Sequence, residues 1–209
     1  MTENMLQRFL RIGTVCAALV VALSSAALAA AGPASSKDWP PYAIARDEAS
    51  LYLRWRTAEP SQDRLTLYRD ETKTGELGTF VEKAPLQAHS VALEGLQPGT
   101  VYPYRISGTK NAGMEGRLRM PRQGRELTFF VVGDTQALTI PGSLDMELSR
   151  QRMTIEAIAG DPVAGDFLVH TGDLVESGAM PEWSGFFRLV SPLTSKMPLF
   201  AVKGNHDDR

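Results

Sequence analysis

The chain has 209 residues, of which 43 % are hydrophobic and 22 % are charged, and this composition is ordinary for one or two globular domains. Its formal net charge is −2, and it contains no cluster of Lys and Arg residues. It therefore offers no electrostatic basis for binding nucleic acid or an anionic membrane surface.

The first 29 residues have the features of a signal peptide. Arg8 and Arg11 form a basic start, residues 12–23 are a nearly unbroken apolar run, and Ala27-Leu28-Ala29 provides a cleavage site. The apolar run is short for a membrane span, and an uncleaved N-terminal anchor is the alternative interpretation. We expect residues 1–29 to be removed during export to the periplasm or the exterior, which leaves no transmembrane span.

Export would also remove the only cysteine, Cys16. The mature protein would then contain no thiol, so it would fold in an oxidising compartment without disulfides and could form no cysteine metal site. Residues 30–40 follow, and their small, polar and proline-bearing composition predicts a linker.

Residues 41–122 are predicted to form an all-β sandwich. Short segments with alternating apolar residues, such as Leu51, Leu53 and Trp55, are separated by turn signals. The segment 96–102, Leu-Gln-Pro-Gly-Thr-Val-Tyr, resembles the tyrosine corner of fibronectin type III modules, and Trp55 lies where such modules carry a core tryptophan. A generic all-β module is the alternative. In either case we expect a scaffold, in which His89 is an ordinary surface residue.

From residue 123 onward the pattern changes to that of a parallel α/β domain. Apolar runs without alternation predict buried strands at 127–132, 167–169 and 199–202. Residues 144–160 predict a helix capped by Asp145, and a second helix with an aromatic core stripe begins at Pro181. The order β-α-β-α-β predicts a parallel sheet within residues 123–209.

A polar motif follows each of the three predicted strands. The motifs are Gly133-Asp134-Thr135-Gln136, His170-Thr171-Gly172-Asp173 and Gly204-Asn205-His206-Asp207. In open α/β sheets, ligands bind at the carboxyl ends of the strands. Each motif alone is a common polar turn, but their order resembles the calcineurin-like metallophosphoesterase family. The preceding sandwich is similar to the one that precedes the catalytic domain in purple-acid-phosphatase-like proteins.

This resemblance implies an exported, metal-dependent hydrolase of phosphate mono- or diesters. By resemblance, Asp134 and, more weakly, Gln136 ligate the first metal ion, Asp173 bridges both ions, and Asn205 ligates the second ion. His206 would contact the phosphate and stabilise the leaving group. Two metal ions together lower the pKa of a bound water and clamp the phosphate. Fe, Mn, Zn and Mg all remain open as the metals.

Three further residues have expected roles around this site. His170 matches a position that supports the metals without binding them, and Asp207 is the nearest candidate to hold the second ring nitrogen of His206. Purple acid phosphatases carry a metal-binding tyrosine three residues after the bridging aspartate. This chain has Glu176 there, so we expect no tyrosinate colour and a solvated glutamate side chain.

The later histidine motifs of the family are absent, because the sequence has only three histidines and none lies beyond His206. The α/β domain is therefore expected to be incomplete, with an unpaired strand edge and an uncovered apolar sheet face. The alternative function is that of a catalytically incompetent fragment, which acts at most as a β-sandwich binding or interaction module. The sequence leaves the oligomeric state open.

Overall fold

The computed structural model describes residues 38–47, 50–109, 113–124, 126–136 and 144–207, without the side chains of residues 144–149. The predicted signal peptide, Cys16 and residues 30–37 of the predicted linker lie outside the described residues. Within the described part, no helix is both long enough and apolar enough to cross a membrane.

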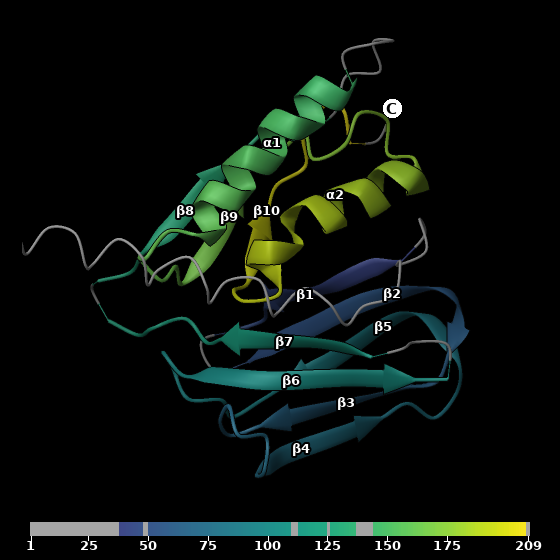
Figure 1. The fold of residues 1–209 in the computed structure, drawn as a ribbon, viewed down its shortest axis with the longest axis vertical. Coiled ribbons are helices and arrows are strands. Elements are labelled where there is room, and N and C mark those ends of the chain that lie inside the picture. Colours follow the sequence, from purple (N-terminus) through teal and green to yellow (C-terminus); the bar gives the residue numbers. More distant parts are fainter. Residues whose placement is uncertain (1–37, 48–49, 110–112, 125, 137–143, 208–209) are drawn as a thin grey trace, which may run out of the picture. The chain divides into compact units, whose positions relative to one another are not determined.

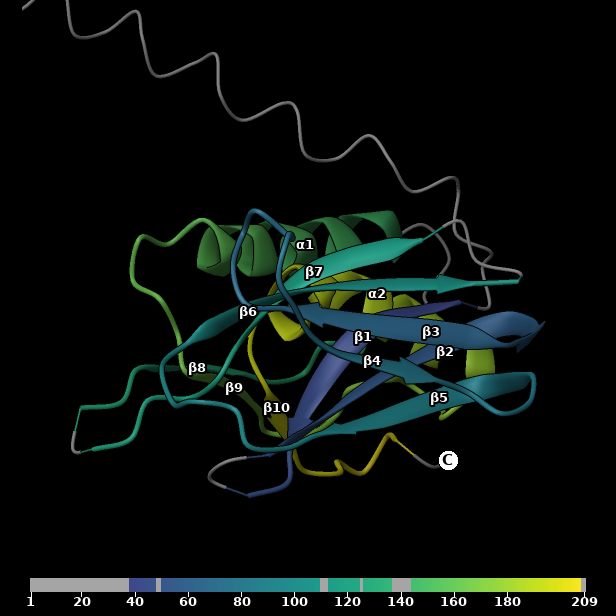
Figure 2. The same cartoon turned by 90° about the horizontal axis from the view of Figure 1, so that it is seen from below.

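Seven strands form two antiparallel sheets in the first part of the chain (Figure 1). One sheet has the order β1-β2-β5 and the other has the order β4-β3-β6-β7. The strands are β1 (Trp39–Ala45), β2 (Leu51–Ser61), β3 (Asp63–Tyr68), β4 (Glu76–Val81), β5 (Leu86–Leu93), β6 (Val101–Gly108) and β7 (Met114–Arg119). Figure 2 shows the two sheets from below.

A single apolar core is buried between these two sheets. The alternation in β2 places Leu51, Leu53 and Trp55 in this core, as the sequence pattern predicts. Residues of β3 and β6 meet them from the opposite sheet, among them Leu65 and Tyr104. The fold of this part is therefore a β-sandwich.

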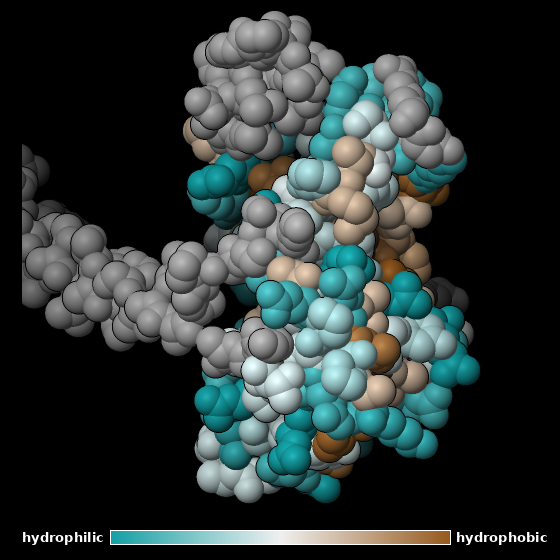
Figure 3. Space-filling model, turned by 90° about the vertical axis from the view of Figure 1, so that its right-hand side faces the viewer, coloured by the Kyte–Doolittle hydropathy of each residue, from teal (hydrophilic) through white to brown (hydrophobic). Residues whose placement is uncertain are grey.

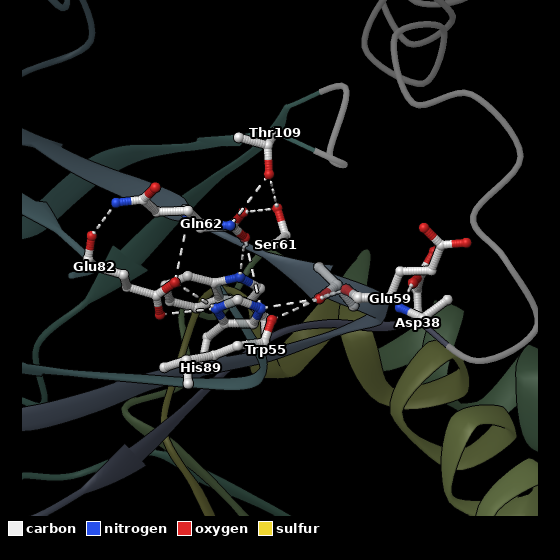
Figure 4. A network of polar contacts seen from close by, with 12 residues as sticks. Asp38, Trp55, Glu59, Ser61, Gln62, Glu82, His89 and Thr109 are labelled. Carbon is white, nitrogen blue, oxygen red and sulfur yellow. Dashed lines mark hydrogen bonds and ion pairs between the residues drawn. The ribbon is translucent and has the colours of Figure 1, made fainter. Parts of the chain in front are cut away.

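His89 is buried in the sandwich, so its prediction as a surface residue is wrong. Only 2 % of the residue is exposed, and its ring stacks on Trp55 with a centroid distance of 4.8 Å. Its Nδ1 lies 2.8 Å from Oε1 of Glu82, and its Nε2 lies 3.0 Å from Oγ1 of Thr57 (Figure 4). Side chains along a strand point alternately to its two faces, so residue 89 lies on the same face of β5 as residues 91 and 93. This placement explains its burial.

The second part of the chain is a parallel β-α-β-α-β unit, as predicted. The sheet has the order β10-β9-β8, and both helices lie on the same face of it (Figure 1). The elements are β8 (Phe129–Val132), α1 (Leu144–Ala159), β9 (Phe167–His170), α2 (Met180–Thr194) and β10 (Leu199–Ala201). Helix α1 begins one residue before Asp145, which therefore lies inside its first turn.

The three parallel strands are buried on one face only, so the prediction of fully buried strands is wrong. Leu168 and His170 point toward the helices and are buried, whereas Phe129, Val131 and Phe200 are 51 %, 55 % and 44 % exposed. The reason is that α1 and α2 cover the same face, and the described residues place no element on the other. The expected apolar face is thus present in the described part. Apolar groups are also scattered among hydrophilic ones on the side that Figure 3 shows.

Strand β1 contributes to both hydrophobic cores. Ala43 is fully buried in the sandwich core, whereas the rings of Trp39 and Tyr42 stack on Phe187 of α2 at 4.5 and 4.3 Å. Ala43 also forms a parallel bridge to Pro198, just before β10. The strand begins at Trp39, inside the stretch predicted as a linker, because these aromatic rings pack against α2.

Candidate active site

The loops that follow β8, β9 and β10 approach one another so closely at two glycines that any added side chain would force a neighbour to move. A Cβ atom on Gly133 would lie 2.2 Å from Oγ1 of Thr171, and one on Gly204 would lie 2.1 Å from Oδ1 of Asp173. Gly172 has a φ of 112°, which side chains rarely allow. The glycines of the three motifs therefore bring the three loops into direct contact.

Asp134 and Asp173 share an unusual backbone conformation. Both have a φ of 53°, in the left-handed region, and among the described non-glycine residues only Lys73 does the same. Two backbone hydrogen bonds hold them together. The N–H of Asp134 donates to the carbonyl oxygen of Gly172 at 3.2 Å, and the N–H of Gln136 donates to that of Asp173 at 3.1 Å. Such strained positions persist only where neighbours fix them, and they concentrate at functional sites.

The third loop is attached to the second through two carboxylates. The N–H of His206 donates to Oδ1 of Asp173 at 3.0 Å. The carboxylate of Asp207, which is 6 % exposed, accepts from the N–H of Val175 at 2.9 Å and from that of Gly204 at 2.7 Å. The Asp207 carboxylate is therefore occupied by backbone groups.

Glu176, rather than Asp207, faces the ring of His206. Oε1 of Glu176 lies 3.2 Å from Nδ1 of His206, outside hydrogen-bond alignment, and the two side chains are 22 % and 18 % exposed. Oε2 of Glu176 is buried without a partner. The prediction of Asp207 as the partner of His206 and that of a solvated Glu176 are both wrong. The position of Glu176, three residues after Asp173, is the sequence signal that could have identified it.

His170 is fully buried beneath the loops. Its Nδ1 accepts from the N–H of Gly172 at 3.3 Å, so the proton must be on Nε2, which lies 2.9 Å from Oγ1 of Thr135. The Thr135 hydroxyl in turn donates to the carbonyl oxygen of Leu174 at 3.2 Å. Burial lowers the pKa of His170, against the charges of nearby aspartates that raise it. A neutral imidazole thus links the first two loops, and neither of its nitrogens is free to bind a metal.

Among the described residues, no three His, Cys, Asp or Glu side chains gather into a metal site, so a metal ion here would also need amide oxygens as ligands. Oε1 of Gln136 is buried and has no hydrogen-bond partner, which suits a ligand of a cation. Asp134 and Asn205 are exposed, and Asp173 is half-buried beside them. The structure thus brings Asp134, Gln136 and Asp173 together through backbone contacts, with Asn205 on the adjoining loop.

The α/β part of the chain matches a known protein family. Residues 127–209 match the family described as calcineurin-like phosphoesterase. Purple acid phosphatase 22 of Arabidopsis thaliana is 29 % identical over 119 residues, which are 57 % of this chain and 24 % of that protein. Probable purple acid phosphatase 20 of the same plant is 30 % identical over 122 residues, 58 % of this chain and 26 % of that protein. The chain thus spans about a quarter of the length of the curated relatives it matches.

Two solved structures share the fold. Purple acid phosphatase PPD1 from yellow lupin (Lupinus luteus) seeds has a TM-score of 0.59 at 15 % identity, over 79 % of this chain and 35 % of that one. PhoD has a TM-score of 0.60 at 14 % identity, over 84 % of this chain and 40 % of that one. Residues 127–209 therefore match the calcineurin-like phosphoesterase family, and the chain is similar in sequence to purple acid phosphatases over part of its length.

Proposed function

We propose that this chain belongs to an exported, metal-dependent phosphoesterase that hydrolyses phosphate mono- or diesters at a dinuclear metal site. The observation that carries the proposal is the shared left-handed backbone of Asp134 and Asp173, fixed by hydrogen bonds between their loops. Strain at two acidic residues in contacting loops is expected where the side chains must face a common ligand.

Each residue of the three loops has a proposed role. Asp134 and Gln136 would hold the first metal ion, Asp173 would bridge the two ions, and Asn205 would hold the second. When bound, the ions would neutralise phosphate charge and supply an activated water. His206 would face the phosphate through the ring nitrogen that does not face Glu176, while His170 and Asp207 hold the loops in place.

Export and a fibronectin type III-like sandwich are part of the same proposal. The basic, apolar and small-residue pattern of residues 1–29 supports export. The strand orders β1-β2-β5 and β4-β3-β6-β7 support the sandwich type. So does the hydrogen bond of 2.9 Å from the N–H of Gln97 to the hydroxyl of Tyr102, which is the contact that a tyrosine corner makes.

The alternative function is a β-sandwich binding module without catalysis. It is favoured by the absence of any group of three His, Cys, Asp or Glu side chains in metal-binding reach within the described ranges.

Hydrolysis of p-nitrophenyl phosphate and of its bis-ester separates the two functions. The purified chain would be assayed with Mn²⁺, Zn²⁺ or Fe²⁺, beside Asp173→Asn, whose amide oxygen can still accept from the N–H of His206. Metal-dependent turnover that Asp173→Asn abolishes supports the enzyme, and no turnover from folded protein supports the module.

A further inference from the structure

Helix α1 makes a polar contact to the loop that follows β8. Nε2 of Gln151 donates a hydrogen bond to the backbone carbonyl oxygen of Gln136 at 3.1 Å. Because a carbonyl oxygen can only accept, this contact fixes the orientation of the Gln151 amide group. The amide oxygen of Gln151 is buried on the other side and has no hydrogen-bond partner.

Gln136 is consequently held from two directions. Its N–H donates to the carbonyl oxygen of Asp173 at 3.1 Å, and its own carbonyl oxygen accepts from Gln151. The backbone is thus fixed between the loop after β9 and helix α1, while the side-chain oxygen Oε1 is buried without a partner. Leaving a buried acceptor unsatisfied is unfavourable, so both of these amide oxygens are suited to accept from a hydrogen-bond donor or to bind a cation.

We propose that Gln151 is a positioning residue, which holds the backbone of Gln136 so that the Gln136 side-chain oxygen faces a hard divalent cation. The inference rests on the proposed function and adds to it a residue outside the three motifs and a class of metal. Amide and carboxylate oxygens are preferred ligands of Mg²⁺ and Mn²⁺. Ions that prefer thiolate or imidazole ligands bind such oxygens less well. The nitrogens of His170 do not compete, because both are engaged in hydrogen bonds.

Binding of Mn²⁺ to the purified full chain tests this role without an activity assay. Bound Mn²⁺ is counted from the loss of the electron paramagnetic resonance signal of the free ion. In Gln151→Met the side chain keeps its length and helix propensity but loses the amide donor. We expect Mn²⁺ binding to weaken by about 10- to 100-fold, the usual effect of removing a residue that orients a ligand. Gln151→Ala is the second variant if the methionine disturbs packing.

Two controls separate positioning from folding. Gln123→Leu changes an exposed glutamine in the connection between β7 and β8 and is expected to bind Mn²⁺ like the unaltered chain. The melting temperatures of all variants are measured by circular dichroism, and weaker binding counts only for a variant that melts near the unaltered chain. If Gln151→Met and Gln151→Ala both fold and bind Mn²⁺ as tightly as the unaltered chain, the positioning role is wrong.

Asp173→Asn distinguishes failure of this inference from failure of the proposed function. If Mn²⁺ binding is lost in Asp173→Asn but intact in both Gln151 variants, the metal site stands and only the role of Gln151 is overturned. If the chain binds no divalent ion, or if Asp173→Asn binds as well as the unaltered chain, the proposed metal site itself is wrong. Binding of Zn²⁺ without any binding of Mn²⁺ would overturn the preference for a hard cation.

Discussion

Oε1 of Glu176 lies 3.2 Å from Nδ1 of His206, so the third residue after one motif faces the histidine of the next. This relationship joins the loop after β9 to the loop after β10. A carboxylate beside one ring nitrogen favours a proton on that nitrogen, which leaves the other nitrogen to face a ligand. Asp207 does not have this role, since Nδ1 of His206 faces Glu176 while the Asp207 carboxylate accepts from the backbone N–H groups of Val175 and Gly204.

Under the proposed function, replacing Glu176 is expected to reduce phosphate-ester hydrolysis while leaving metal binding unchanged. In Glu176→Leu the imidazole of His206 would lose its orienting carboxylate, and we expect kcat to fall by on the order of 10-fold or more. Bis-p-nitrophenyl phosphate hydrolysis with saturating Mn²⁺ measures the effect. Glu156→Gln, which changes an exposed glutamate on α1, is the matched control and is expected to be unchanged. Equal activities of all three proteins would contradict the orienting role.

Much of this arrangement follows from the sequence, because strand and helix periodicity are local properties. The alternation of Leu51, Leu53 and Trp55 predicts the inward face of β2, and the order of apolar runs predicts the parallel unit. Two sequence-based predictions are wrong because the surroundings of the side chain are set by residues distant in the sequence. His89 is polar but lies opposite Trp55, and Glu176 reaches a histidine 30 positions later.

The exposed face of the three parallel strands shows the same limit. An apolar run without alternation predicts a strand, but it does not tell which elements cover it. Phe129 and Val131 are exposed because both helices pack on the other face of the sheet. Likewise, the motifs identify Asp134 and Asp173 but not the backbone conformation that they share, since φ depends on the hydrogen bonds between the loops.

Replacement of Gly204 by alanine is expected to destabilise the contact between the loops. The new Cβ would lie 2.1 Å from Oδ1 and 2.2 Å from the backbone nitrogen of Asp173, and the backbone cannot move aside freely. We expect the free energy of unfolding to fall by about 1–3 kcal/mol, as for other overpacked sites. Urea denaturation followed by circular dichroism measures this change.

Gly185→Ala is the matched control for the Gly204 variant. Gly185 lies within α2, and a Cβ there would meet no atom within 4 Å. Because alanine has a higher helix propensity than glycine, we expect the free energy of unfolding of this variant to rise by about 0.5–1 kcal/mol. If the two variants changed stability in the same direction, steric contact at Gly204 would not be the cause.

Replacement of His89 by leucine is expected to destabilise the sandwich. The leucine would leave the carboxylate of Glu82 and the hydroxyl of Thr57 without their imidazole partner in a buried setting. We expect a loss of about 1–3 kcal/mol in the free energy of unfolding. Chemical denaturation would be compared with Ser107→Ala, an exposed position on β6, which should change stability by less than about 0.5 kcal/mol. A stable His89→Leu protein would mean that this cluster is not needed to hold the sandwich.

The carboxylate of Asp166 is expected to make stability depend on acidity. The residue is fully buried just before β9, and it accepts hydrogen bonds from the backbone N–H groups of Arg122 and Thr128. Nη2 of Arg122 also donates to it at 2.7 Å. Burial raises the pKa of Asp166, but these hydrogen bonds and the guanidinium charge outweigh burial and lower it from 3.8 to about 2.

Because the folded pKa is depressed, the ionised form contributes stability that is present above pH 3.8 and lost as the pH falls through 2. The lowered pKa corresponds to about 2 kcal/mol in the free energy of unfolding. Solvent screening at the half-exposed Arg122 reduces this contribution to about 1–2 kcal/mol. The asparagine of Asp166→Asn cannot titrate. The free energy of unfolding of this variant should therefore lie below that of the unaltered chain by a constant amount above pH 4, and the difference should shrink between pH 4 and pH 2. Urea unfolding at stepped pH measures this, with the exposed Asp161→Asn as control. A deficit that stays the same across this interval would show that the ion pair with Arg122 does not govern the acid sensitivity.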